Sequence, residues 1–197
     1  MFYFQPKQLI NYDEFAYYSP GMGGLSKEEC QKVLELWDEK EKCKGLTGQP
    51  QNSLLTHIPN EKRQSNIQWI KYNSDTHWLF EKLAKIANDC NQARFNFQLF
   101  GFLEAMQLTE YNEGDHYDWH TDHGNGDFST RKLSMVVQLT DPSEYEGGEL
   151  QILNNKVTQN EQGTVTVFPS YNAHKVHPVK SGKRHSLVVW ITGEPFR

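Results

Sequence analysis

The stretch YDWHTDHG, residues 117 to 124, brings several metal-binding side chains close together in the sequence. One residue separates His120 from Asp122, and alternate side chains of an extended strand point to the same face. The pair would therefore offer an imidazole and a carboxylate to one ion. A divalent metal needs a third protein ligand from a neighbouring segment, and FPSYNAHKVHPV supplies His174 or His177. An H-x-D pair alone is common on protein surfaces, so this interpretation needs support from elsewhere in the chain.

Arg184 provides part of that support. Two imidazoles and one carboxylate on one face of a metal form the ligand set of non-haem Fe(II) oxygenases, which leaves positions open for a co-substrate and O₂. Arg184 opens the strand-like run RHSLVVW, and its planar guanidinium suits a carboxylate. The alternative is a surface arginine beside Lys183. We expect four further histidines of the same half to be solvated or satisfied by hydrogen bonds: His116, His123, His177 and His185.

A hydrolytic zinc site is the rival interpretation of the same ligands. Zinc hydrolysis would need a general base beside a metal-bound water, and Asp118 and Glu110 are the candidates. Neither candidate explains a carboxylate anchor at Arg184. Redox iron therefore accounts for more of the sequence.

The overall composition indicates one globular domain. The chain has 197 residues, of which 37% are hydrophobic and 23% are charged, and it contains no internal repeat. The net charge of −5 argues against a surface that binds nucleic acid by broad phosphate neutralisation.

The sequence also favours a reduced, cytoplasmic environment. The opening MFYFQPKQLINYDEF does not resemble a signal peptide, and no segment is long and apolar enough to suggest a membrane partner. Cys30, Cys43 and Cys90 are widely spaced and odd in number, so we expect reduced and mostly buried thiols. We predict a cytoplasmic protein.

The elements that must position the site change in character along the chain. Ser26 and Glu29 are spaced as a capping box, which predicts a helix from Ser26 to about Cys43. The stretch 45 to 66 indicates a long loop, which we consider as a substrate lid. IQWIKY is typical of a strand and DTHWLFEKLAKIANDCN of a second helix. After Arg94 come strand-like runs: FNFQLFGFLEAMQLTEY, KLSMVVQLT, GELQIL, GTVTVF, AHKVHPV and RHSLVVWIT.

This pattern predicts a mainly β fold with flanking helices. Helices followed by many short strands favour an antiparallel jelly roll, or double-stranded β-helix, with the N-terminal helices packed on one sheet. We expect a single domain over residues 1 to 197. Its helical part would cover about 1 to 94, and its jelly-roll core about 95 to 194.

Three ordered segments then carry a resemblance to a known family. They are EYNEGDHYDWHTDH, RKLSMVVQLTDPSEYEGGELQI and GTVTVFPSYNAHKVHPVKSGKRHSLVVW, and they cover roughly residues 105 to 192. Together they resemble the 2-oxoglutarate and Fe(II)-dependent dioxygenases, in the prolyl 4-hydroxylase-like branch that includes the PKHD-type hydroxylases. The helix opened by GGLSKEEC is similar to an N-terminal element of that family.

The resemblance implies a role for individual residues. His120, Asp122 and His174 correspond to the Fe(II) ligands, and Arg184 to the partner of the distal carboxylate of 2-oxoglutarate. Further implied roles are support of that carboxylate by Tyr111, a pocket wall at Trp190 and a substrate-facing position for Tyr117. Trp190 could instead be a core residue of an apolar strand. Gly147 and Gly148 indicate a tight turn before ELQIL.

Two positions depart from patterns in the wider family. Gln138 stands where some relatives place an aromatic residue that helps to bind 2-oxoglutarate. Trp190 stands where the nucleic-acid-demethylating branch has a second arginine, which argues against base repair.

The implied activity is hydroxylation of an unactivated C–H bond with release of succinate and CO₂. The resemblance favours a prolyl residue in a protein or peptide as substrate, with Fe(II), 2-oxoglutarate as co-substrate, and O₂. A free amino acid or small metabolite is the alternative substrate, and a non-catalytic ligand-binding jelly roll is the alternative class. The sequence does not decide the substrate, the hydroxylated position, the oligomeric state or a role for ascorbate.

Overall fold

The computed structural model describes residues 15–45, 62–153, 155–156 and 159–195, with only the backbone described at 155–156. The suggested lid at 45 to 66 falls largely on residues 46–61, which lie outside the described residues. Among the described helices, none is long and apolar enough to cross a membrane.

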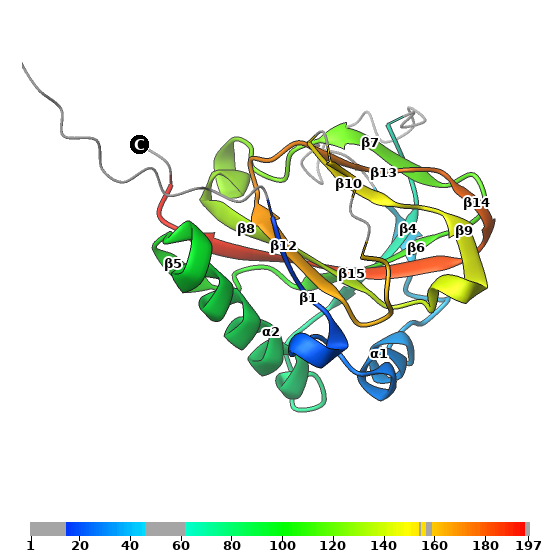
Figure 1. The fold of residues 1–197 in the computed structure, drawn as a ribbon, viewed down its shortest axis with the longest axis horizontal. Helices are drawn as coiled ribbons and strands as arrows, with labels where there is room; N and C mark the ends of the chain where they lie inside the picture. The colour runs from blue at the N-terminus through cyan, green and yellow to red at the C-terminus, as the bar shows by residue number, and fades with distance from the viewer. Residues whose placement is uncertain (1–14, 46–61, 154, 157–158, 196–197) are drawn as a thin grey trace, which may run out of the picture.

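Two antiparallel sheets face each other across the interior (Figure 1). The larger sheet has the strand order β1-β12-β8-β15-β6-β4-β2, and β5 pairs with one end of β15. In that order its strands are β1 (Ala16–Tyr18), β12 (Val165–Pro169), β8 (Arg131–Gln138), β15 (Arg184–Gly193), β6 (Met106–Tyr111), β4 (Asn66–Ile70), β2 (Cys43–Lys44) and β5 (Leu99–Gly101).

The smaller sheet has the order β11-β10-β13-β7-β3. Its strands are β11 (Asn155–Lys156), β10 (Leu150–Ile152), β13 (His174–Val176), β7 (His116–His120) and β3 (Arg63–Gln64). A separate pair, β9 (Tyr145–Gly147) and β14 (Val179–Gly182), follows at one end. The predicted jelly roll is therefore confirmed, and each strand-like run of the C-terminal half contains at least one strand.

Two helices cover the outer face of the larger sheet (Figure 1). They are α1 (Lys27–Leu34) and α2 (His77–Cys90), and one π-helical turn follows α2 at Asn91–Phe95. Short 3-10 turns occupy Pro20–Met22, Gly126–Thr130 and Pro142–Glu144. Cys30 and Cys90 are buried, Cys43 is exposed, and none of the three forms a disulfide among the described residues.

The first helix begins as predicted but ends earlier. The Ser26 hydroxyl accepts from the Glu29 amide at 3.2 Å, and the Glu29 carboxylate accepts from the Ser26 amide at 2.7 Å. The prediction of a helix to Cys43 is wrong, because α1 ends at Leu34. Gln68 of β4 donates to the Leu36 carbonyl at 2.7 Å and accepts from the Asp38 amide at 2.7 Å. Gln68 therefore occupies backbone hydrogen-bonding groups that a longer helix would have paired internally.

Strand alternation divides the larger sheet into two chemically different faces. Its outer face is apolar and forms the main core with the helices, through residues such as Leu133, Met135, Val137, Val165, Val167, Leu187 and Val189. Its inner face carries buried polar side chains, among them Ser134, Gln138, Thr164, Thr166, Arg184 and Ser186. A smaller apolar cluster lies between the sheets: Tyr111, Val136, Leu150, Ile152, Phe168, Val176 and Val179. Polar groups concentrated on the inner face are suited to a site rather than to a second core.

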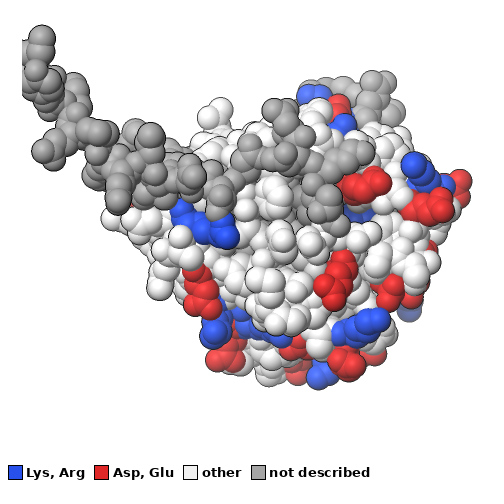
Figure 2. All heavy atoms as spheres, viewed as in Figure 1, with Lys and Arg blue, Asp and Glu red and all other residues white. Residues whose placement is uncertain are grey.

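On the face seen in Figure 2, Lys and Arg are interspersed with Asp and Glu. That mixture is in keeping with the modest net charge of −5.

Candidate metal centre

Three side chains converge at one end of the space between the sheets. His174 lies directly opposite His120 in the pairing of β13 with β7. The Nε2 atom of His120 is 3.8 Å from Asp122 Oδ1, and that of His174 is 3.5 Å from Asp122 Oδ2. The three potential ligand atoms all lie within 4.8 Å of one another. One ion could therefore contact all three.

Asp122 is positioned at the site by a loop rather than by the strand that we expected. We predicted that one extended strand would place His120 and Asp122 on the same face, but β7 ends at His120. Asp122 lies in the loop beyond, where its amide donates to the Ser170 carbonyl at 3.0 Å. Ser134 on β8 donates its hydroxyl to Asp122 Oδ2 at 2.6 Å. The carboxylate is therefore positioned by the larger sheet and by the segment before β13.

Backbone carbonyls orient both imidazoles. His120 Nδ1 lies 2.8 Å from the Asp118 carbonyl, and His174 Nδ1 lies 3.0 Å from the Asn172 carbonyl. A carbonyl can only accept, so each contact favours a proton on Nδ1 and leaves the Nε2 lone pair for a ligand bond. Both Nε2 atoms face Asp122, which is the arrangement that a metal requires.

The electrostatics give His120 and Asp122 the protonation states of metal ligands. Burial and the nearby His174 lower the pKa of His120 to about 4, so its imidazole is neutral at neutral pH. Burial alone would raise the pKa of Asp122, but His174, His120 and the Ser134 hydrogen bond outweigh it and lower that pKa. The site thus combines an ionised carboxylate with a neutral imidazole at His120.

Aromatic and guanidinium groups surround the ligands. Tyr117 stacks on His120 with ring centroids 3.5 Å apart, and the Arg63 guanidinium lies 4.7 Å from the Tyr117 ring. Burial raises the pKa of Tyr117 to about 12, so its phenol is protonated. The observed contact of Tyr117 is with a candidate ligand, and its predicted position facing the substrate stays a prediction.

Trp190 lies on the inner face of β15, opposite Ser134 of β8. The Arg131 guanidinium is 3.8 Å from the Trp190 ring and 4.4 Å from the Phe128 ring, and it donates to the Asp122 carbonyl at 3.3 Å. The same guanidinium forms a two-pronged ion pair with Glu104. Trp190 is buried but belongs to neither apolar cluster. Arg131 and Ser134 are additions to the site that the motif analysis missed.

Arg184 lies at the other end of the inner face. It is 3% exposed, and its Nε donates to Gln138 Oε1 at 3.1 Å. Gln138 in turn donates to the Thr140 carbonyl and to the Tyr145 hydroxyl, each at 3.0 Å. The ring of Tyr111, which is also buried, has its centroid 5.6 Å from the guanidinium carbon. The guanidinium is therefore held in one orientation, and Gln138 takes part in holding it.

A cavity of about 570 Å³ adjoins Arg184. Its wall includes Val136, Gln138, Gly148, Leu150, Thr164, Thr166 and Arg184. The three candidate metal ligands are not part of this wall. Asp122 contacts Ser134 in the middle of β8, whereas Gln138, which lines the cavity, is the last residue of that strand. Ser134 and Gln138 are separated by roughly 13 Å of strand, since a strand rises about 3.3 Å per residue. The candidate metal ligands and Arg184 therefore lie at two separate places along the inner face of the larger sheet.

The glycines near the anchor have the predicted structural role. Gly147 and Gly148 have φ of +78° and +65°. A Cβ at Gly148 would lie 2.8 Å from Arg184 Cδ, so this turn passes close to the arginine stem. Glycine at 148 therefore leaves room for Arg184.

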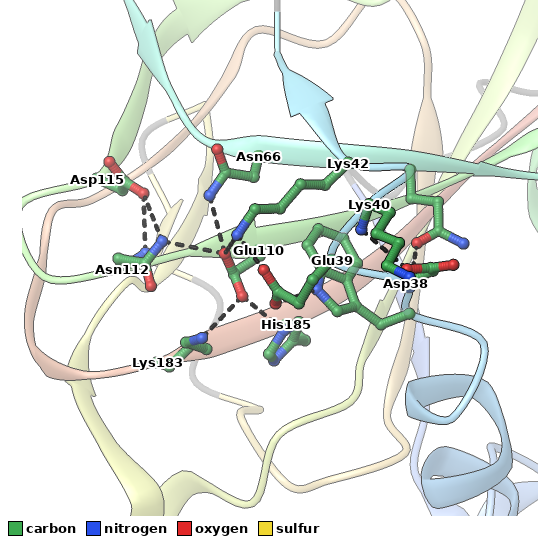
Figure 3. A network of polar contacts seen from close by, with 12 residues as sticks. Asp38, Glu39, Lys40, Lys42, Asn66, Glu110, Asn112, Asp115, Lys183 and His185 are labelled. Atoms are coloured by element: carbon green, nitrogen blue, oxygen red, sulfur yellow. Dashed lines mark hydrogen bonds and ion pairs between the residues drawn. The ribbon is translucent and has the colours of Figure 1, made fainter.

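Two of the other sequence candidates, His177 and Glu110, have partners elsewhere. His177 Nε2 lies 2.7 Å from Gln151 Oε1, so the structure brings His174, rather than His177, to Asp122. Glu110, the suggested zinc-site base, lies on β6 in a separate polar network (Figure 3). Its partners there are Lys183 at 2.9 Å, Asn66 at 2.8 Å, Asn112 at 3.1 Å and His185 at 3.5 Å.

Comparison with known proteins identifies the family of proteins to which this fold and this set of metal ligands belong. Residues 106–192 match the sequence profile of the 2OG-Fe(II) oxygenase superfamily. The chain is also 33% identical over 170 residues to a PKHD-type hydroxylase of Prochlorococcus marinus strain NATL2A, covering 85% of this chain and 74% of that protein. The protein belongs to the 2OG-Fe(II) oxygenase superfamily, as the sequence motifs predicted. Membership implies Fe(II), 2-oxoglutarate and O₂, and the His-Asp-His set suits Fe(II).

More specifically, its relatives include several PKHD-type hydroxylases. A PKHD-type hydroxylase of Synechococcus sp. strain CC9902 is 35% identical over 99 residues, which are 49% of this chain and 45% of that protein. The match therefore spans less than half the length of this relative.

Solved structures support the fold. A Pseudomonas putida prolyl-4-hydroxylase aligns with a TM-score of 0.66 at 20% identity, covering 92% of this chain and 93% of that one. A Trichoplax adhaerens prolyl hydroxylase, solved with a peptide fragment of the hypoxia inducible factor oxygen degradation domain, aligns with a TM-score of 0.70 at 20% identity. That alignment covers 93% of this chain and 86% of the other.

Proposed function

We propose that this protein is a dioxygenase that hydroxylates an unactivated C–H bond and converts 2-oxoglutarate to succinate and CO₂. The observation that carries the proposal is the convergence of His120, Asp122 and His174 at one end of a face whose other end holds the buried Arg184. In this proposal the three convergent residues bind Fe(II), and Arg184 binds the distal carboxylate of the co-substrate.

The chemistry of the donor set fits Fe(II). The Nε2 atoms of His120 and His174 face the Asp122 carboxylate, and a facial set of this kind leaves positions for 2-oxoglutarate and O₂. When bound, iron supplies the oxidative chemistry that couples decarboxylation of 2-oxoglutarate to hydroxylation. The protein's own groups fix the ligand geometry and shield the ligands from solvent.

The remaining site residues have positioning roles in this proposal. Arg184 receives the carboxylate through charge-assisted hydrogen bonds, and Gln138 keeps its guanidinium oriented. Tyr111, whose ring lies beside that guanidinium, supports the same carboxylate. Trp190, whose ring the Arg131 guanidinium contacts, forms the wall near the metal, and Tyr117 faces the substrate.

The proposed substrate is a prolyl residue in a protein or peptide. Two lines support this choice: the sequence similarity to PKHD-type hydroxylases and the fold shared with prolyl hydroxylases, one of which was solved with a peptide. A free amino acid or small metabolite is the alternative substrate. We also propose that the whole chain acts as one domain and, on sequence grounds, that it works in the cytoplasm.

Product analysis tests this proposal. The enzyme is supplied with Fe(II), 2-oxoglutarate and O₂, and succinate is measured with a proline-containing peptide, the same peptide with alanine for proline, or free proline. We expect succinate formation that rises with the proline peptide and a gain of one oxygen atom on proline by mass spectrometry. Oxygen gain on free proline alone would favour the metabolite alternative. Binding of 2-oxoglutarate without any turnover would contradict an enzyme and support a binding module.

A further inference from the structure

Thr164 carries a buried hydroxyl that its surroundings do not satisfy. Its residue exposure is 1%, and Oγ1 has no hydrogen-bond partner among the residues that the structure describes. The backbone of Thr164 is satisfied, because its amide donates to Glu161 at 3.1 Å and its carbonyl accepts from Gln138 at 2.9 Å. A buried polar group without a partner destabilises the fold, so an unpaired hydroxyl here requires an explanation.

The position of Thr164 in the sheet supplies that explanation. Val165 pairs with Val137, which places Thr164 beside Gln138 on the inner face of the sheet. Gln138 pairs with Ser186 on the far side, next to Arg184. Thr164, Gln138 and Arg184 all line the same cavity of about 570 Å³. The hydroxyl and the guanidinium therefore face a common space.

Neighbouring groups are already committed to other contacts. The two amide hydrogens of Gln138 go to the Thr140 carbonyl and the Tyr145 hydroxyl, and its Oε1 accepts from Arg184. Gln138 thus bridges to the arginine and not to Thr164. A ligand that occupies the cavity would supply an acceptor for the hydroxyl.

We propose that Thr164 donates its hydroxyl to the distal carboxylate of 2-oxoglutarate, in addition to the contacts proposed for Arg184 and Tyr111. The inference rests on the proposed function, because it takes Arg184 as the carboxylate anchor. A carboxylate accepts several hydrogen bonds, and a hydroxyl donating to it forms a charge-assisted bond. A site that offers both donors discriminates against a 2-oxo acid that ends in a methyl group, since that ligand leaves the donors unpaired.

The test measures binding rather than turnover. Dissociation constants for 2-oxoglutarate and for 2-oxovalerate, which has the same chain length but no distal carboxylate, are measured by calorimetry on the Mn(II)-loaded protein. Thr164→Val removes the hydroxyl and keeps the shape, whereas Thr164→Ser keeps the hydroxyl. We expect the valine variant to bind 2-oxoglutarate about 10-fold more weakly or worse, since hydrogen bonds to charged groups contribute about 1.5–3 kcal/mol. Its affinity for 2-oxovalerate should stay unchanged, and the serine variant should bind both ligands like the parent.

Thermal unfolding without ligand provides an independent readout. Replacing an unsatisfied buried hydroxyl by a methyl group should raise the Tm of Thr164→Val, even though the variant binds the co-substrate less well. Thr166→Val is the matched control, because Thr166 lines the same cavity but its hydroxyl is not among the unsatisfied atoms. We expect this control to keep the parent's preference for 2-oxoglutarate over 2-oxovalerate.

Two results would overturn the inference. One is a valine variant with the parent's affinity for 2-oxoglutarate, and the other is an equal loss of affinity for both ligands. If the valine variant does not fold, Thr164→Ala provides the same comparison. Failure of the parent protein to bind 2-oxoglutarate at all would instead refute the proposed function, so the two failures are distinguishable.

Discussion

The carboxylate of Asp122 is held by a residue that lies outside the metal-binding motif. The Ser134 hydroxyl donates to Asp122 Oδ2 at 2.6 Å and lies 3.0 Å from the Ser170 hydroxyl. The backbone carbonyl of Ser170 accepts a hydrogen bond from the Asp122 amide. Groups that orient a ligand in this way commonly contribute about 10- to 100-fold to metal affinity. At the residue scale, Ser134 therefore belongs to the metal centre.

We predict that Ser134→Ala binds Mn(II) or Fe(II) about 10- to 100-fold more weakly than the parent. The physical reason is that Asp122 loses its hydrogen-bond donor and becomes free to rotate away from the histidines. Anaerobic metal titration followed by calorimetry measures the affinity. Ser143→Ala, in the 3-10 turn Pro142–Glu144, is the control and should bind metal normally. Equal affinities of the two variants would show that Ser134 does not support the ligand.

At the scale of single elements, the cap of α1 is a local feature that should affect stability alone. The reciprocal hydrogen bonds of Ser26 and Glu29 satisfy two amides at the start of the helix. We predict that Ser26→Ala lowers the free energy of unfolding by about 1 kcal/mol, the usual contribution of such a cap. Urea unfolding measures this change. Metal affinity should be unaltered because α1 packs on the outer face of the larger sheet, and a parallel loss of metal binding would contradict this separation.

The difference between contacts close in sequence and contacts between distant segments explains what the sequence could and could not predict. The start of α1 is set by Ser26 and Glu29, which are close in sequence, so the capping pattern predicted it correctly. Just beyond its end, the backbone at Leu36 and Asp38 contacts Gln68, a residue of another element that no local pattern reveals. Alternation likewise predicted the strands of the C-terminal half. Strand order depends on pairing between distant segments, and the jelly roll was recognised through the family resemblance.

In the candidate site, too, local patterns identified residues but not the distant contacts that position them. The H-x-D motif identified His120 and Asp122, although Asp122 is positioned by Ser170 and Ser134 rather than by strand alternation. The choice of His174 over His177 came from the resemblance, and the β13–β7 register now accounts for it physically. Thr164 escaped notice because its significance depends on the cavity that it shares with Arg184.

At the scale of the whole molecule, the network around Glu110 joins β6 to β4 and β15 (Figure 3). Burial alone would raise the pKa of Glu110, but hydrogen bonds from Lys183, Asn66 and Asn112 outweigh it and lower the pKa to about 2. The ordinary value for a glutamate is 4.5. A carboxyl whose pKa is lowered by folding stabilises the fold above the unfolded value, and that stability is lost as pH falls toward the folded value.

We predict that Glu110→Gln lowers the free energy of unfolding by about 2–3 kcal/mol at pH 7. The difference in free energy of unfolding between variant and parent should stay constant above about pH 5.5. It should narrow as the pH falls from 4.5 toward 2, because the parent's carboxyl then becomes neutral. Urea unfolding at a series of pH values measures it. Glu81→Gln, on the exposed side of α2 with its side chain 76% exposed, is the control and should differ little from the parent. A gap that widens in acid would refute this account of Glu110.

The most direct test of the central claim compares two histidines of one segment. Fe(II) and 2-oxoglutarate are added without O₂, and the weak visible charge-transfer band of the iron–2-oxoglutarate complex is recorded for the parent, His174→Ala and His177→Ala. The parent and His177→Ala should show the band, because His177 contacts Gln151 rather than Asp122. His174→Ala should not, because it removes one of the three convergent ligands. A band that persists without His174 and disappears without His177 would contradict the proposed metal centre.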